Sequence, residues 1–189
     1  MTESPPAGRP EPGPPVSGRP TGADRVRLFG IMSGAWVAQC CYALAKLGLP
    51  DLMAAGPRPV AELAASAGLD ERALHRMLRG LAAAGLLRED APGHFGLTPV
   101  AQPLRSDVFG SSRDTAIIFG EEVFRSFAEI TYTLRTGKPA FDKTYGQPFY
   151  DYLGDNPAAA RTFGTARGGA GVPAVLSACD LGGLRTVVD

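Results

Sequence analysis

The sequence offers few residues whose type and spacing could carry out covalent chemistry. Its three cysteines (Cys40, Cys41 and Cys179) have no metal-binding spacing and make no even disulfide set, which is typical of a reducing cytoplasm. Its two histidines, His75 and His94, fall on different expected elements. We therefore assign no catalytic residue and no metal ligand to this chain, and we expect a cytoplasmic protein.

The residues best suited to binding are aromatic. Five of them fall within twelve positions: Phe141, Tyr145, Phe149, Tyr150 and Tyr152. Aromatic clusters near a loop can line a pocket for a planar ligand. The alternative is a hydrophobic patch that holds this segment onto its neighbour, and both interpretations remain open from the sequence.

A second candidate is the basic face of one expected helix. It carries Arg72, His75, Arg76 and Arg79, where a DNA-reading helix would place its contacts. A solvated helix face is the alternative, with His75 exposed on it and His94 at a hairpin tip. Residues 23–110 hold nine basic and eight acidic residues, a net charge of +1, whereas DNA binding needs several phosphate contacts. We therefore expect no nucleic-acid partner.

The elements that must position these residues begin after a tail. Residues 1–22 are half proline and glycine, so we expect them to be disordered. The next 18 uncharged residues, 28–45, approach the length of a membrane-spanning helix. Ser33, Gln39 and small residues argue against insertion into a membrane, so we expect no membrane partner. We instead predict a soluble helix over 24–47. This helix is apolar nearly all round, which suggests that a second copy covers it.

A compact helical run follows. Apolar residues at helical spacing predict helices before and after Gly68, with Gly68 ending the first and Asp70 capping the second. The segment from Leu86 to Leu97 predicts a small hairpin with its turn at 91–94. Thr98 before Pro99 predicts the cap of another helix. Helix, turn, helix and hairpin together indicate a winged helix.

The rest of the chain predicts a second helical block. We expect one long helix over 113–135, a helix over 156–167 that Gly168 and Gly169 interrupt, and a short helix over 173–179. The final segment, 184–189, is rich in strand-forming residues and looks like the first strand of an α/β sheet. A lone strand leaves its backbone groups unpaired, so we expect the chain to be an N-terminal portion of a longer protein.

The predicted fold is therefore mainly α. It consists of a disordered tail (1–22), a winged-helix dimerisation domain (23–110), a helical linker block forming a substrate lid (111–182), and the first strand of a truncated Rossmann-like α/β domain (183–189).

This order of elements resembles the N-terminal half of bacterial small-molecule O-methyltransferases that use S-adenosylmethionine, which are laid out like the plant phenolic O-methyltransferases and act in secondary metabolism. The resemblance covers residues 24–189. The strings that carry it are Ala61–Ala64, Leu69–Asp70, Leu74–Leu81, Gly85–Leu87, Phe95–Ala101, Gly146–Leu153 and Arg185–Asp189.

The resemblance implies a homodimer that interlocks through the 24–47 helix, and a lid that positions a small aromatic hydroxylated substrate. It implies substrate contacts by Tyr145, Phe149, Phe163 and Arg167. In members of the family, the loop that binds S-adenosylmethionine and the general base follow the part that this sequence resembles. We therefore expect these 189 residues to be inactive alone.

The sequence departs from the family at the last of these contacts. The family commonly has Phe-Asn-x-x-Met where this chain reads Phe163 to Arg167. Arg167 either faces an anionic group of the substrate or is solvated. Two other functions remain alternatives: a winged-helix DNA-binding regulator, and a stand-alone dimeric ligand-binding scaffold.

Overall fold

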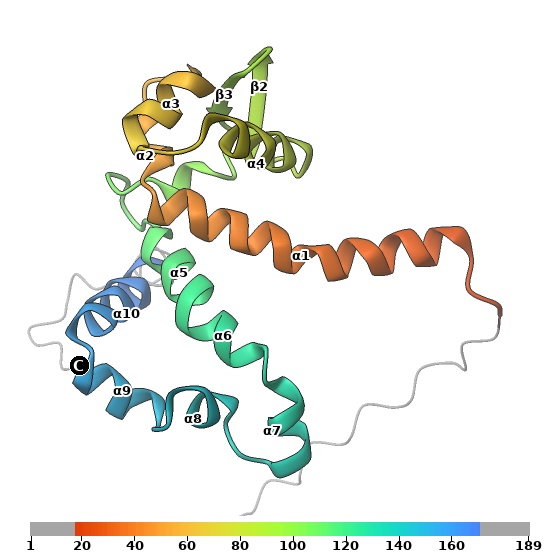
Figure 1. The fold of residues 1–189 in the computed structure, drawn as a ribbon, viewed down its shortest axis with the longest axis vertical. Coiled ribbons are helices and arrows are strands. Elements are labelled where there is room, and N and C mark those ends of the chain that lie inside the picture. The colour runs from red at the N-terminus through yellow and green to blue at the C-terminus, as the bar shows by residue number, and fades with distance from the viewer. Residues whose placement is uncertain (1–17, 171–189) are drawn as a thin grey trace, which may run out of the picture. The chain divides into compact units, whose positions relative to one another are not determined.

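The computed structural model describes residues 18–170. Contacts between residues divide the chain into a unit up to Ser33 and a unit from Gly34. The described elements are α1 (Gly22–Lys46), α2 (Leu49–Leu52), β1 (Arg58–Pro59), α3 (Val60–Ala67), α4 (Glu71–Ala83), β2 (Leu87–Ala91), β3 (His94–Leu97), η1 (Gln102–Leu104), α5 (Arg113–Ile118), η2 (Phe119–Val123), α6 (Phe124–Phe127), α7 (Ile130–Thr136), α8 (Ala140–Tyr145), α9 (Phe149–Asp155) and α10 (Pro157–Ala170) (Figure 1).

The described part of the first unit is the start of α1. The backbone amide of Thr21 donates to the Asp24 carboxylate (2.9 Å), and the Thr21 hydroxyl accepts from the Asp24 amide (3.2 Å). This reciprocal pair is a capping box, which satisfies N–H groups that the first helical turn leaves unpaired. The helix therefore begins at Gly22, two residues before the predicted start.

The second unit contains the helix, turn, helix and hairpin predicted from the sequence. Gly68 ends α3 in the left-handed conformation (φ 65°), and the Asp70 carboxylate caps α4 by accepting from the Ala73 amide at 2.7 Å. The β2–β3 hairpin gains a third strand, because β1 pairs antiparallel with β3. Strand β1 and the short helix α2 were not predicted from the sequence.

The core of this unit lies between the end of α1, α2, α3, α4 and the sheet. Its fully buried large side chains are Leu44, Leu49, Met53, Leu63, Leu78, Leu81 and Phe95. The apolar positions that predicted α3 and α4 therefore do face the core. Burial of a leucine or phenylalanine side chain contributes about 1.5–3 kcal/mol, so this cluster fixes the second half of α1 against the hairpin.

The helical block after η1 is built of short segments. Helix α10 packs against α5 and α9, and α8 packs against α6, α7 and α9. Gly137, with φ 69°, ends α7, and Gly146, with φ 77°, ends α8. Segments far apart in sequence, α5 and α10, thus lie side by side (Figure 1).

The prediction of one long helix over 113–135 was wrong. The α-helix changes to a π-helix at η2 and is interrupted at Ala128–Glu129. The prediction that Gly168 and Gly169 interrupt the helix was also wrong, because α10 continues to Ala170. Glycine in a helix interior costs only about 1 kcal/mol relative to alanine, which packing against α5 and α9 can offset.

Two smaller predictions differ from the structure. No helix begins at Pro99; the Thr98 hydroxyl instead donates to the carbonyls of Gly85 (2.9 Å) and Leu86 (2.8 Å), which ties the end of β3 to the start of β2. The His75 side chain is half-buried rather than solvated, with its ring edge against Phe95 at a centroid distance of 5.8 Å. The predicted tail up to residue 17, the helix over 173–179 and the strand over 184–189 lie outside the described residues.

Candidate functional site

Aromatic side chains gather where α8, α9 and α10 meet. The rings of Phe141 and Tyr145 stack with their centroids 4.4 Å apart. Phe149 makes edge-to-face contacts with Phe141 at 5.0 Å and with Phe163 at 4.9 Å. These separations are typical of aromatic pairs that stabilise each other beyond their buried area. The cluster thus forms one continuous set of rings across three helices.

Local sequence explains this placement. Phe141 and Tyr145 are four residues apart on α8, so their side chains share one face of that helix. Gly146 ends α8 in the left-handed conformation, and Pro148 precedes the first turn of α9. The chain therefore reverses within a few residues and returns Phe149 to the rings of α8.

An apolar cavity of about 400 Å³ lies beside this cluster. Its walls come from η2 and from α6 through α10, and they include Phe127, Ile130, Phe141, Phe149 and Phe163. A cavity of this size, lined mostly by aromatic and aliphatic side chains, is typical of a small-molecule site. A flat, apolar ligand would find ring faces and edges on several sides.

The four predicted site residues have different positions around this cavity. Phe149 and Phe163 line it, and both are half-buried. Tyr145 stacks on Phe141 and does not line it. Arg167 is exposed, with its guanidinium carbon 5.9 Å from the Phe163 ring centroid, a cation–π distance. Contact of these four residues with a ligand stays a prediction.

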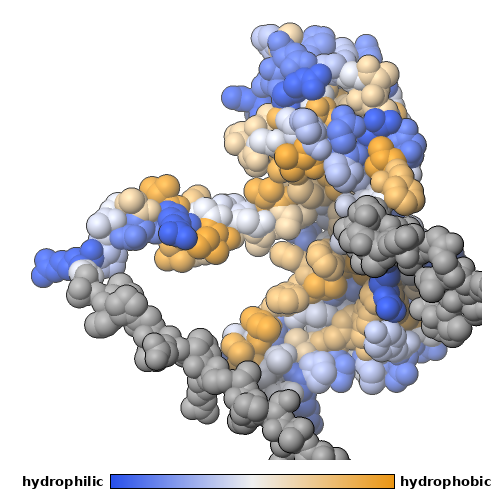
Figure 2. All heavy atoms as spheres, turned by 180° about the vertical axis from the view of Figure 1, so that it is seen from behind, coloured by the Kyte–Doolittle hydropathy of each residue, from blue (hydrophilic) through white to orange (hydrophobic). Residues whose placement is uncertain are grey.

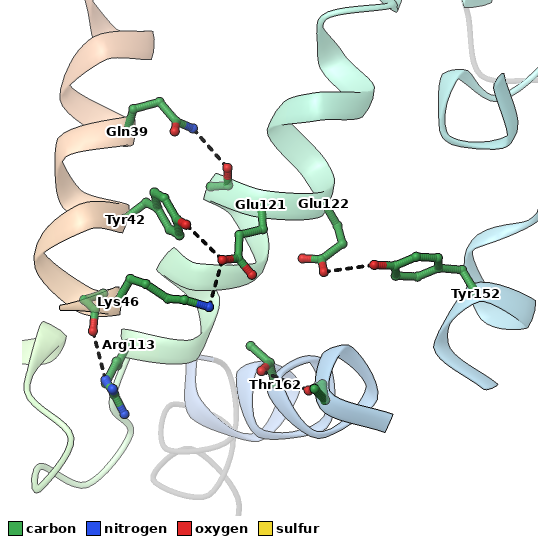
Figure 3. A network of polar contacts seen from close by, with 11 residues as sticks. Gln39, Tyr42, Lys46, Arg113, Glu121, Glu122, Tyr152 and Thr162 are labelled. Carbon is green, nitrogen blue, oxygen red and sulfur yellow. Dashed lines mark hydrogen bonds and ion pairs between the residues drawn. The ribbon is translucent and has the colours of Figure 1, made fainter. Parts of the chain in front are cut away.

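A polar network lies on the other side of η2, facing α1. The Glu121 carboxylate accepts from the Tyr42 hydroxyl at 2.8 Å and forms an ion pair with the Lys46 ammonium, also at 2.8 Å (Figure 3). The Gln39 amide donates to the Gly120 carbonyl at 3.3 Å. Three successive turns of α1 therefore bind the same short segment of π-helix.

The electrostatics of this network are mutually supporting. Burial raises the pKa of Glu121, but the hydrogen bonds from Lys46 and Tyr42 outweigh it, so the pKa falls below its usual value. The same carboxylate, by hydrogen bonding, raises the pKa of Lys46 and that of Tyr42. At neutral pH the pair is therefore fully charged, and the tyrosine keeps its proton to donate.

Gly120 allows this close approach of α1. A Cβ at this position would clash with the Cβ and ring of Tyr42, so no larger residue fits without movement of α1. The π-helical turn begins one residue earlier, at Phe119. Such π-helical turns are rare and are frequent at functional sites.

The neighbouring Glu122 faces the opposite way, toward α9. Its side chain is buried, with 6% of the residue exposed, and it accepts one long hydrogen bond of 3.4 Å from the Tyr152 hydroxyl (Figure 3). Its Oε2 has no hydrogen-bond partner in the part of the chain that the structure describes. Both residues line a second, polar cavity of about 300 Å³, together with Lys46, Asp155, Asn156 and Thr162.

Glu121 and Glu122 were not predicted as site residues from the sequence. Two successive glutamates follow the apolar run Ile117–Phe119 inside an expected helix, and this placement was the available signal. Their roles depend on a change from α- to π-helix and on partners about 30 to 80 residues away in sequence. Periodicity within one segment does not contain that information.

The surface of α1 is strongly apolar. Among its side chains, Val26 is 74% exposed, Ile31 70% and Met32 61%, and hydrophobic residues are visible along the helix in Figure 2. By length and composition alone, α1 could cross a membrane. A further apolar cavity of about 590 Å³ lies between Ala35 and Ala38 of α1 and residues 119–128.

The described residues do not fit a nucleotide-type cofactor or a metal. Within residues 18–170, no group of three His, Cys, Asp or Glu side chains could hold a metal ion. The described sheet is antiparallel, and β1, which leads into α3, does so without a glycine-rich turn. Nucleotide-type cofactors such as S-adenosylmethionine sit at glycine-rich turns after parallel strands, an arrangement that the described residues do not contain.

Comparison with known proteins supplies a family. Residues 29–107 match the family described as the O-methyltransferase dimerisation domain. The chain is 41% identical over 165 residues to phenazine O-methyltransferase PhzM of Lysobacter antibioticus. The aligned residues cover 86% of this chain and 48% of the relative.

Solved structures agree. The crystal structure of LaPhzM has a TM-score of 0.78 with 40% sequence identity, over 83% of this chain and 48% of that one. An O-methyltransferase from neocarzinostatin biosynthesis (NcsB1), in complex with S-adenosylhomocysteine and 1,4-dihydroxy-2-naphthoic acid, has a TM-score of 0.59 with 34% identity, over 67% of this chain and 39% of that one. The chain thus spans about half the length of the curated relative described above, in its N-terminal part.

Proposed function

Because residues 29–107 match the O-methyltransferase dimerisation domain, we propose that the chain belongs to that family and is the dimerisation and acceptor-binding portion of an S-adenosylmethionine-dependent O-methyltransferase. The acceptor in this proposal is a small aromatic molecule with a hydroxyl group. The observation that carries the proposal is the apolar cavity lined by Phe149 and Phe163. We place the activity in the cytoplasm.

The cavity's chemistry supports an aromatic acceptor. Phe149 and Phe163 meet edge to face, so a planar ligand can stack on one ring and meet the edge of the other. The relatives fit the same class, since one is named for phenazine and another was crystallised with a dihydroxynaphthoic acid. Burial of a flat ligand among these rings excludes water and fixes its orientation.

Arg167 and Tyr145 take supporting positions in this proposal. The Arg167 guanidinium lies near the Phe163 ring, which lines the cavity, so we expect it to be within reach of an acidic group on the acceptor. Tyr145 stacks behind Phe141 and holds that wall of the cavity. Burial raises the pKa of Tyr145, so its hydroxyl remains protonated at neutral pH.

We also propose that the homodimer forms through α1. The family is named for dimerisation, and its match begins at residue 29, within this helix. The apolar exposure of Val26, Ile31 and Met32 supports a second copy as the cover. Burying such side chains between two chains would contribute about 1.5–3 kcal/mol each.

Acceptor binding is tested by nuclear magnetic resonance titration of the ¹⁵N-labelled chain with 1,4-dihydroxy-2-naphthoic acid. We expect shifts confined to η2 and to α6 through α10, which line the cavity. We also expect about tenfold weaker binding for Phe163→Ala, since an aromatic contact contributes about 0.5–1.5 kcal/mol beyond buried area. The matched control is Phe109→Ala, which removes a ring that is 85% exposed and does not line this cavity. Equal affinities of the two variants would contradict the proposal.

Arg167 has its own test with the same ligand. If it faces the acid group, Arg167→Gln weakens binding of the naphthoic acid but not of 1,4-dihydroxynaphthalene, which lacks the carboxylate. If Arg167 is solvated, both ligands bind the variant and the unmodified chain equally.

The chain by itself should not bind the methyl donor, because the described residues provide no site for it. Calorimetry with S-adenosylmethionine checks this expectation. Micromolar binding by these 189 residues would show that the division of labour proposed here is wrong.

A further inference from the structure

We propose that Glu122 anchors an amino group of a small ligand in the polar cavity between η2, α9 and α10. This amine site is defined by the Glu122 carboxylate, the Tyr152 ring and the start of α10. It is separate from the apolar cavity of the proposed acceptor site and does not depend on that proposal.

The Glu122 carboxylate is buried but poorly supplied with hydrogen-bond donors. Glu122 is 94% buried, yet no donor among residues 18–170 reaches its Oε2. Within the same residues its other oxygen has one contact, 3.4 Å from the Tyr152 hydroxyl, which is beyond the usual range. A buried carboxylate without donors loses hydration that nothing replaces. Rotation about the last side-chain bond exchanges the two oxygens, so a donor in the cavity can bind either.

The two adjacent glutamates differ in their hydrogen-bond donors. Glu121 has two donors on α1, the Tyr42 hydroxyl and the Lys46 ammonium, both at 2.8 Å. Glu122 has one weak donor and, within residues 18–170, no ion pair. The π-helical turn therefore places one satisfied and one unsatisfied carboxylate on opposite sides of the same segment.

The side chains that line the cavity carry more negative than positive charge. The cavity is lined by three carboxylates, those of Glu121, Glu122 and Asp155, and by one cation, Lys46, which is already paired with Glu121. Arg125 is a further cation, close enough for its charge to act on Tyr152, and it forms no ion pair with Glu122 within residues 18–170. An excess of negative charge in a partly enclosed space favours a cationic ligand over an anionic one.

The size of the cavity sets the ligand class. A volume of about 300 Å³ is at the lower end for small-molecule sites, which suits one ring carrying an amine. Tyr152 lines the same cavity, so an ammonium group bound by the carboxylate lies near an aromatic ring, which attracts cations. We therefore expect a primary amine on a short or single-ring framework.

Benzylamine, which is a cation at neutral pH, is the probe, and benzoate is its anionic counterpart. Each is titrated into the ¹⁵N-labelled chain with backbone amide shifts as the readout. We expect benzylamine to shift signals of η2, α9 and the first turn of α10, and benzoate to shift none of them. Shifts by both probes alike, or by neither, would overturn the proposal.

Variants separate the carboxylate from its surroundings. Glu122→Gln should weaken benzylamine binding at least tenfold, because it removes the charge but keeps the shape. Glu129→Gln is the matched control; it removes an exposed carboxylate paired with Lys143, outside the cavity, and should bind benzylamine unchanged. Equal affinity of these two variants would contradict an anchoring role for Glu122.

Tyr152→Phe keeps the test valid if Glu122→Gln does not fold. This change removes the one donor to the Glu122 carboxylate found among residues 18–170 and keeps the ring. Benzylamine should bind the variant at least as tightly as the unmodified chain, because the amine no longer competes with the tyrosine hydroxyl. Loss of binding would show that the hydroxyl, and not the carboxylate, holds the ligand.

Discussion

At the scale of single residues, Gly120 has the most specific requirement. Most glycines inside helices weaken them, because glycine loses more backbone entropy on folding than alanine does. Gly120 is retained where the Cβ and ring of Tyr42 occupy the space that a side chain would need. The contact joins α1 to η2 beside the Glu121 network, so a change here should reach both.

Two glycine-to-alanine substitutions should therefore have opposite effects. Gly80→Ala, in α4 with no atom within 4 Å of the added methyl group, should stabilise the chain by about 0.5–1 kcal/mol. Gly120→Ala should destabilise it by about 1–3 kcal/mol, because overpacking forces α1 away. Urea denaturation of both variants measures the difference, and equal stabilisation by both would refute the close contact.

The Glu121–Lys46 pair predicts a pH dependence. The pKa of Glu121 is lowered in the folded chain, so its stabilisation is present above the usual value of 4.5 and is lost as pH falls through the folded value. The pKa of Lys46 is raised, so its contribution is present below 10.5 and is lost as pH rises through its folded value. The pair is therefore complete between these limits.

Glu121→Gln should accordingly cost about 0.5–1 kcal/mol at pH 7, the range for a partly exposed ion pair. The cost should shrink toward zero as pH falls below the folded pKa of Glu121, because the unmodified carboxyl is then neutral as well. Urea denaturation at several pH values checks this. A cost that stays constant down to acidic pH would mean that shape, and not charge, explains the effect of the substitution.

At the scale of elements, the sequence predicted what local rules determine. The leucine stripe and Asp70 predicted α4 because both act within a few residues. The π-helix η2 was not predictable in this way. It forms where Gly120, Glu121 and Glu122 meet partners on α1 and α9, and only the folded chain brings those helices together.

The candidate site likewise has one part that was predictable from the sequence and one part that was not. The aromatic cluster was visible because its rings are close in sequence, and Phe149 and Phe163 do line a cavity. The Glu122 cavity was invisible, because its walls combine residues from Lys46 to Thr162. Tyr145 was selected by position alone and lies behind the wall.

The cap of α4 gives a prediction at this scale. Asp70→Ala removes the side-chain acceptor for the Ala73 amide and should cost about 1 kcal/mol. Asp70→Asn retains an acceptor oxygen and should cost less. Thermal unfolding of the two variants tests this order, and an equal loss of stability would show that the charge of Asp70, and not its hydrogen bond, supports the helix.

At the scale of the whole molecule, α1 links stability to assembly. The second half of the helix is held by the core, where Leu44 and Ala45 are completely buried. Its first half presents large apolar side chains to the surroundings, with Val26 and Ile31 among the most exposed. This exposed apolar surface does not stabilise a single chain. Two chains can bury it against each other, because an interface with a twofold axis uses the same surface of both chains.

Charge substitutions on this surface test the proposed dimer. The double variant Val26→Asp and Ile31→Asp should become monomeric by light scattering at micromolar concentration, because pairing would bury four carboxylates without partners. Leu134→Asp, on α7 and 79% exposed, is the matched control and should leave the dimer intact. Since the two altered positions contribute nothing to the buried core of the second unit, the monomer should unfold at a urea concentration that no longer depends on protein concentration. Dimers of unchanged affinity in the double variant would move the interface away from α1.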